Sequence, residues 1–348
     1  MTCERSAVDA AGMDSPPIDA ANCIGDGYTR FCFAALPTNT INFVSAQSIS
    51  TDPGASVYCS PDFVDVCVVA AGTITISALG TATGSRPVAL VATTMITVEA
   101  DGGIDVASHN GTTVGAGADP SDCIAGTPPV MLAGSYGGSF GGVGGNGGGG
   151  SAGAIGGIPP AAITPTSLRG GCAGGNGSGA NPTAGGQGGG AIALVAGTSV
   201  TIAGQVNASG TRGGGSAAGA SGAGGAGGGS GGLIVLDAPM LKVSGIVIAN
   251  GGGGGEGTDG LTVGNPGLDP DLTKPTTPAA GGANGSSFGG DGGAGAAGGT
   301  AAAAGSRGMG GIGIGGGGGG GGAGYIHVVG MLSNAGTISP SSPDSSVR

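Results

Sequence analysis

The chain has 348 residues, of which 89 are glycine, and charged residues make up only 8%. This glycine content excludes an ordinary helical protein, because glycine inside a helix costs about 0.5–1 kcal/mol relative to alanine. The net charge of −11, from nine Lys and Arg against 20 Asp and Glu, argues against nucleic acids and anionic membranes as partners.

Residues 1–63 are predicted to form a disulfide-bearing N-terminal segment, because they hold four of the seven cysteines and six of the ten aromatic residues. The cysteines lack the spacing of zinc ligands, which favours disulfides and an oxidising compartment. Chain order suggests three pairs, although other pairings stay open: Cys23 with Cys32, Cys59 with Cys67, and Cys123 with Cys172. The remaining Cys3 would be free, lost in processing or part of a lipid anchor.

The chain start lacks the apolar stretch of a secretory signal peptide. Since the cysteine content favours export, we expect an extracellular or cell-surface protein whose leader is absent from this sequence. No apolar run approaches the roughly 18 residues of a membrane-spanning helix, so we expect no membrane span.

Residues 64–133 are predicted to form the first rungs of a β-solenoid. The segments 72–80 and 87–111 contain short runs in which β-branched residues alternate with polar ones. Alternation with a period of two indicates strands with one buried face. Glycine or asparagine stands at the corners between these runs, as expected where a strand turns into the next.

Residues 134–340 repeat this plan between glycine-rich runs. The blocks 191–210, 233–250 and 325–339 each contain an apolar strand, a polar corner, an alternating strand, a glycine turn and a further strand. One such rung cannot bury its inner face alone, so it must stack on the next with parallel, in-register pairing. The expected fold is all-β: a parallel β-solenoid interrupted by long glycine-rich arms, with residues 341–348 as a tail.

The glycine-rich runs 134–190, 211–232 and 251–324 are either disordered linkers or packed arms. They carry mostly glycine and alanine instead of the Ser, Thr, Glu and Lys of flexible linkers, and they lie inside the repeat array. Glycine can adopt an extended threefold helix with a rise of about 3.1 Å per residue. We therefore favour packed polyglycine II helices, with disorder as the alternative.

One segment resembles a calcium site. Residues 254–262 match a calcium-binding nonapeptide, and its nearby carboxylates are Glu256, Asp259, Asp269 and Asp271. Such motifs work in tandem copies, and a single copy is expected by chance in a glycine-rich chain. We therefore expect no cofactor, with calcium at these four residues as the alternative.

Catalysis has little support in the sequence, since His109 and His327 lie far apart and the best group of acids is Glu99, Asp101 and Asp105. Binding is predicted instead at loop tips between the arms. The candidate tip residues are Tyr136, Phe140 and Phe288, for which local packing is the alternative interpretation.

Several segments together resemble uncharacterised glycine-rich exported proteins of myxobacteria and their relatives. They are the cysteine-bearing N-terminal segment and residues 73–76, 115–123, 168–172 and 228–239. The rungs more loosely resemble β-helical haemagglutinin-type adhesins, and the glycine runs resemble the polyglycine-helix tips of phage adhesins. The first resemblance implies no known activity and carries over no catalytic residue.

The function expected from the sequence is that of a non-enzymatic secreted or cell-surface structural or adhesion protein, with a cell-surface glycan or protein as partner. The alternatives are a β-helical carbohydrate-active enzyme and a purely structural coat or matrix protein. The ligand and the oligomeric state stay open.

Overall fold

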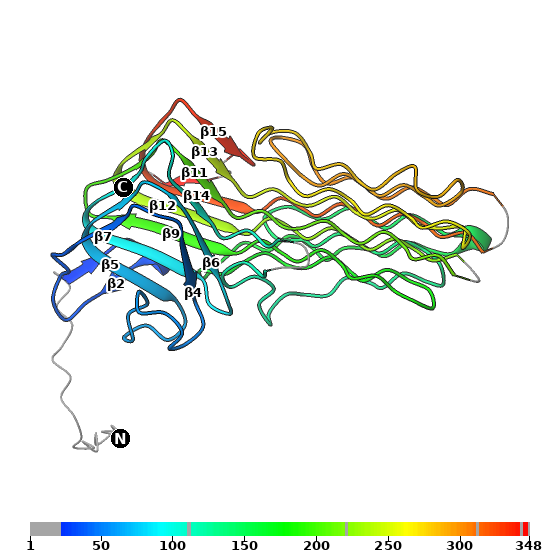
Figure 1. The fold of residues 1–348 in the computed structure, drawn as a ribbon, viewed down its shortest axis with the longest axis horizontal. Helices are drawn as coiled ribbons and strands as arrows, with labels where there is room; N and C mark the ends of the chain where they lie inside the picture. The colour runs from blue at the N-terminus through cyan, green and yellow to red at the C-terminus, as the bar shows by residue number, and fades with distance from the viewer. Residues whose placement is uncertain (1–21, 110–112, 220–221, 311–312, 342–343, 347–348) are drawn as a thin grey trace, which may run out of the picture.

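The computed structural model describes residues 22–109, 113–219, 222–310, 313–341 and 344–346. The protein is all-β, with two sheets of parallel strands, one small antiparallel pair and two short 3₁₀ turns (Figure 1). The turns are η2 (Gly27–Thr29) and η3 (Ser151–Gly153), and the antiparallel pair is β1 (Cys23–Ile24) with β2 (Phe31–Cys32). The prediction of an all-β chain with parallel strands is confirmed.

The larger sheet has the strand order β16-β14-β12-β10-β7-β5-β3, and β9 pairs with both β7 and β12. Its strands are β3 (Thr40–Phe43), β5 (Cys67–Ile76), β7 (Val88–Val98), β9 (Ala191–Ala196), β10 (Ser199–Ile202), β12 (Leu233–Val243), β14 (Tyr325–Asn334) and β16 (Asp344–Ser346). The second sheet has the order β15-β13-β11-β8-β6-β4. Its strands are β4 (Gln47–Ser50), β6 (Leu79–Thr83), β8 (Gly103–Asp105), β11 (Gln205–Asn207), β13 (Ile246–Ile248) and β15 (Thr337–Ser339).

The strands stack in register, so that equivalent apolar residues form columns. One column runs through Ile74, Ile96, Val200, Leu241 and Leu332 on five successive strands. The first four of these side chains are buried in one core between the sheets. The alternating pattern of the sequence therefore places its apolar positions inside, as a period of two requires.

The N-terminal segment covers the outer face of the larger sheet with a second, smaller core that includes Ile24, Phe31 and Phe33. Asp237 of β12 is fully buried beneath it, and its Oδ2 accepts hydrogen bonds from the Asp26 N–H at 2.9 Å and the Thr29 hydroxyl at 3.1 Å. These bonds join the segment to the middle of the sheet.

Three disulfides fasten the described chain: Cys23–Cys32, Cys59–Cys67 and Cys123–Cys172. They are the three pairs that chain order suggested, whereas Cys3 lies outside the described residues. The Arg169 Nη2 lies 3.1 Å and 3.2 Å from the two sulfurs of the third disulfide. In the described parts of the chain, no helix has the length and apolar character needed to cross a membrane.

The glycine-rich segments extend side by side away from the sheets (Figure 1). Residues 315–322 lie in the middle of these segments. Their consecutive N–H groups donate in turn to three neighbouring segments, so that each neighbour receives a hydrogen bond from every third residue. The hydrogen bonds run from Gly316, Gly319 and Gly322 to the carbonyls of Leu132, Ser135 and Gly138; from Gly315, Gly318 and Gly321 to those of Thr258, Gly255 and Gly252; and from Gly317 and Gly320 to those of Ser306 and Ala303.

Carbonyls of the same central segment accept hydrogen bonds from three further neighbours. The donors are Gly225, Gly228 and Gly231 in one segment, Gly145 and Gly148 in a second, and Gly290, Gly293 and Ala296 in a third. Backbone groups in the segment are therefore paired as completely as those of a sheet, although they contribute to no strand.

Candidate functional site

The loops that close the glycine-rich segments gather at the end of the molecule farthest from the sheets, here called the distal end (Figure 1). Hydrogen bonds join loops that are distant in sequence: the Val130 N–H donates to the Ile155 carbonyl at 3.0 Å, and the Met309 N–H to the Phe288 carbonyl at 2.9 Å. Eight large apolar side chains of these loops are exposed: Val130, Met131, Ile155, Ile158, Leu261, Val263, Phe288 and Met309.

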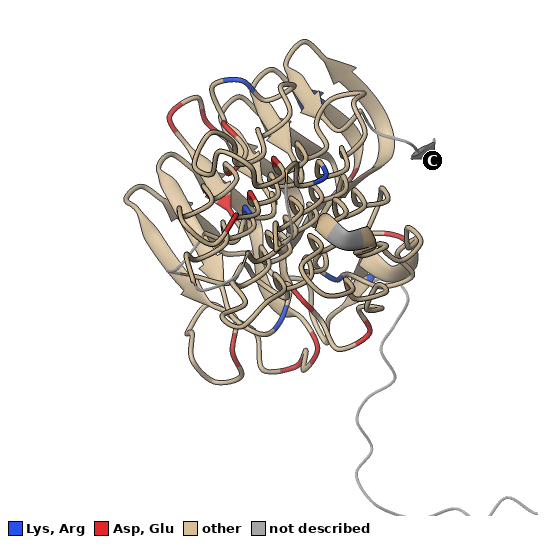
Figure 2. Ribbon diagram, turned by 90° about the vertical axis from the view of Figure 1, so that its right-hand side faces the viewer, with Lys and Arg blue, Asp and Glu red and all other residues tan. Residues whose placement is uncertain are grey.

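Exposure at the distal end is extensive, with Leu261 at 86% and Met309 at 73% of their full accessible area. Figure 2 looks onto this end and colours the charged residues of the protein. The segments 130–132, 154–158, 259–263, 286–288 and 307–310 contain two charged residues, Asp259 and Arg307. Clustered exposed apolar residues of this kind mark interaction surfaces.

Of the three predicted tip residues, only Phe288 lies exposed at the distal end. Phe140 is fully buried, and the Arg169 guanidinium lies 5.3 Å from the centre of its ring, so its prediction as a tip is wrong. Tyr136 is half-buried, and its ring lies against the backbone of Gly126 and Gly175. A large ring next to glycine fills the space that absent side chains leave, which explains the position of Tyr136. Phe140 instead belongs to the second, smaller core, together with Leu168.

The four carboxylates of the predicted calcium site do not come together. Glu256 is fully buried, and its carboxylate accepts N–H groups of Asn265 at 2.8 Å, Gly285 at 2.8 Å and Ser286 at 2.9 Å. It therefore clamps two other backbone segments, at Asn265 and at Gly285–Ser286, to its own, a role that the sequence did not indicate.

The other three acids have separate partners: Asp259 with Leu261 and Thr262, Asp269 with Arg212, and Asp271 with Thr273. Among the described residues, no three His, Cys, Asp or Glu side chains are placed to hold a metal ion. Carboxylates that are each engaged with separate partners do not converge on a cation.

His109 is paired with Asp105, and their Nε2 and Oδ2 atoms lie 3.0 Å apart. The other carboxylate oxygen accepts hydrogen bonds from Asn207 at 3.2 Å and from the Ala107 N–H at 2.9 Å. The hydrogen bond that His109 donates to Asp105 raises the pKa of His109, against the opposing effect of burial.

This pair predicts a small pH dependence of stability. The pKa of His109 is higher in the folded state than in the unfolded state. The contribution of the pair to the free energy of unfolding is therefore fully present below the unfolded-state pKa of about 6.5, and it is lost as the pH rises through the folded-state pKa. For a half-exposed, solvent-screened pair we expect about 0.2–1 kcal/mol. Urea unfolding of the wild type and of His109→Gln at pH 5.5 and 8.5 measures this contribution. The difference in free energy of unfolding between the two proteins should be smaller at pH 8.5 than at pH 5.5. A larger difference at pH 8.5 contradicts the assignment.

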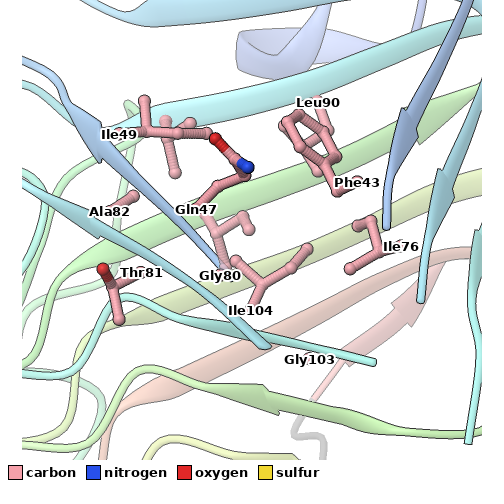
Figure 3. A pocket seen from close by; sticks show the side chains of 12 residues that line it. Phe43, Gln47, Ile49, Ile76, Gly80, Thr81, Ala82, Leu90, Gly103 and Ile104 are labelled. Carbon is pink, nitrogen blue, oxygen red and sulfur yellow. The ribbon is translucent and has the colours of Figure 1, made fainter. Parts of the chain in front are cut away.

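Hollows also lie elsewhere in the described chain. The one in Figure 3 lies between the sheets and is lined by apolar side chains that include Phe43, Ile49 and Ile104; its volume of about 30 Å³ makes it a gap in the core. A surface groove of about 580 Å³ follows the corners at Gly102, Gly204, Gly245 and Gly336, and Asp101 is the one ionisable group in its lining. The carboxylate pair of a typical glycosidase is thus not found in this groove.

Comparisons with family models, curated proteins and solved structures find no match to this chain. The geometry of the distal end is therefore the main basis for a function.

Proposed function

We propose that this is a non-enzymatic, exported adhesion protein that binds its partner through the exposed apolar loops of the distal end. The observation that carries the proposal is the gathering of Met131, Leu261, Phe288 and Met309 at one end, although they are far apart in sequence. Apolar and aromatic side chains in a setting with few charges are typical of the centre of a binding interface.

The proposed architecture explains how these loops are held. The two sheets form the rungs of a β-solenoid, and the glycine-rich segments are polyglycine II helices packed around residues 315–322. The hydrogen bonds that recur every third residue support this assignment, because such a helix has three residues per turn. A ten-residue arm of this kind spans about 31 Å, so it presents the loops well away from the sheets.

The proposed location is the cell surface or the extracellular space, with the partner a cell-surface protein or glycan. Three disulfides in the described chain favour an oxidising compartment. The apolar character of the loops favours a protein over a glycan, since most of the exposed side chains offer no hydrogen bonds to sugar hydroxyls.

Charge substitutions at the distal end test the proposal. We expect Leu261→Asp combined with Met309→Asp to weaken binding to cells, or to arrayed surface proteins and glycans, by at least about tenfold, because a buried unpaired charge is costly. The control is Val57→Asp with Val64→Asp, which places the same two charges on side chains that are 96% and 74% exposed in the loop before β5.

Circular dichroism should show the same folded spectrum for all three proteins. Equal binding by the distal variant and the wild type contradicts the proposal. Absence of any binding by the wild type favours a coat or matrix protein, and turnover of a glycan favours a carbohydrate-active enzyme.

A further inference from the structure

A buried positive charge lies against the sulfurs of the Cys123–Cys172 disulfide. Arg169 is 6% exposed, and its Nη2 lies 3.1 Å from the Cys123 sulfur and 3.2 Å from the Cys172 sulfur. Among the described residues, no Lys or Arg side chain donates a hydrogen bond to a sulfur of the other two disulfides. Within this part of the chain, the third disulfide therefore has an electrostatic setting of its own.

The other contacts of this guanidinium compensate its charge only in part. Its Nη1 donates to the Asp122 carboxylate at 2.6 Å, but that side chain is 66% exposed, so solvent screens its charge. Its Nε donates to the neutral carbonyl of Gly170 at 3.3 Å. Burial lowers the pKa of Arg169 against the effect of Asp122, so the cation loses more to desolvation than its partners return. A second anion next to the guanidinium would therefore be stabilised.

Opening the disulfide supplies such an anion. An uncharged sulfur is a weak hydrogen-bond acceptor, whereas a thiolate carries a negative charge and accepts strongly. An adjacent arginine lowers the pKa of a cysteine thiol, and a thiol of lower pKa leaves a disulfide faster. The contact from Arg169 Nη2 is thus weak while the two sulfurs are bonded, and it becomes strong once either of them is a thiolate. It therefore favours the opened pair over the disulfide.

The two cysteines differ in their access to solvent. Cys123 is partly exposed and stands between Asp122 and Ile124, which are both exposed. Cys172 is 3% exposed, and its N–H donates to the Ser230 hydroxyl at 2.8 Å within the glycine-rich segments. A thiolate in solution therefore reaches Cys123 more readily, which makes Cys172 the leaving sulfur.

We propose that Cys123–Cys172 is a thiol-exchange site, at which a small thiol becomes covalently attached to Cys123. The thiolate of the small molecule attacks Cys123 Sγ, and a new sulfur–sulfur bond forms. The bond to Cys172 breaks, and its electron pair stays on Cys172 Sγ as a thiolate next to Arg169 Nη2. A second molecule of the thiol releases Cys123, which leaves both cysteines reduced and the two small molecules joined by a disulfide. The thiol is the one reductant that these steps need.

Backbone hydrogen bonds hold the same place without the disulfide. The Asp119 N–H donates to the Gly171 carbonyl at 2.9 Å, and the Gly170 N–H donates to the Gly117 carbonyl at 3.0 Å. Exchange therefore removes the covalent tie between the two segments and leaves these contacts in place, so we expect a reversible modification of a folded protein. The site shares no residue with the exposed apolar loops of the distal end, so it stands whether or not those loops bind a partner.

Equilibration of the full chain with reduced and oxidised glutathione at neutral pH tests the proposal, followed by acid quenching, alkylation and mass spectrometry of each cysteine. We expect Cys123–Cys172 to open at a lower ratio of reduced to oxidised glutathione than Cys23–Cys32 and Cys59–Cys67, with glutathione attached to Cys123. Opening of either other disulfide before or together with it, or glutathione attached to Cys172 instead of Cys123, would overturn the proposal.

The variant Arg169→Met separates the charge of this side chain from its packing. We expect the equilibrium constant for reduction of Cys123–Cys172 to fall at least about tenfold in Arg169→Met, because the thiolate loses its cation. If Arg169 only packed the fold, its loss would loosen the region and make the disulfide easier to reduce. The control Asp122→Asn removes the carboxylate that competes with the thiolate for Arg169, and it should leave the constant unchanged or raise it. An unchanged or raised constant in Arg169→Met, or a lowered one in Asp122→Asn, would contradict the proposed site.

Discussion

Gly319→Ala is expected to lower the free energy of unfolding by about 1–3 kcal/mol or more, the cost of overpacking a filled interior. The Gly319 N–H donates to the Ser135 carbonyl at 2.8 Å, and a Cβ at this residue would lie closer than 3.0 Å to the backbone of Gly145 and Asn146. Backbone atoms on both sides cannot rotate away as a side chain could. The added methyl must therefore push the segments apart and stretch their hydrogen bonds.

Gly299→Ala is the matched control, because a Cβ at Gly299 meets no heavy atom within 4 Å and its φ is not in the left-handed region. Removing a flexible glycine at such a site should leave stability unchanged or raise it by about 0.4–1 kcal/mol. Urea unfolding compares the two variants with the wild type, and hydrogen exchange follows the amides of residues 315–322. Equal stability of both variants, with rapid exchange of these amides, would show that the glycine-rich segments are not packed.

The strands could be predicted from the sequence because their signal is local. Ile96, Val200 and Leu241 each sit in a short alternating run, and the alternation alone assigns them to one buried face. The distal end has no comparable signal. Met131, Leu261 and Met309 belong to separate runs without strand alternation, and only the return path of each segment brings them to one place.

The sequence does contain a signal for the arrangement of the glycine-rich segments. It is a repeat of three residues and not a pattern of hydropathy. A unit of two glycines and one other residue is repeated at two places: it ends at Val143 and Asn146 in one segment, and at Asp291 and Ala294 in another. None of these four side chains is buried. A helix with three residues per turn points every third side chain in one direction. In the proposed polyglycine II arrangement, outer segments can therefore carry a side chain at each third position, whereas residues 315–322, which exchange hydrogen bonds with six neighbouring segments, are glycine throughout.

Glu256→Ala is expected to destabilise the protein by about 3 kcal/mol or more. The buried carboxylate accepts the N–H groups of Asn265, Gly285 and Ser286, and each would lose its partner, at about 1–3 kcal/mol for each unsatisfied group. Glu256→Gln keeps one acceptor oxygen and should cost less. Asp271→Ala, a carboxylate bonded only within its own loop, should change the free energy of unfolding by less than about 0.5 kcal/mol.

Thermal unfolding with and without calcium separates this clamp from the calcium site that the sequence pattern suggested. A carboxylate whose two oxygens already hold three backbone N–H groups gains nothing from added calcium, so the melting temperature of the wild type should be the same in calcium and in a chelator. If calcium raised the melting temperature of the wild type but not that of Glu256→Ala, Glu256 would instead be a calcium ligand. Equal stability of Glu256→Ala and Asp271→Ala would contradict the clamp, because only Glu256 is buried and bonded to three separate backbone groups.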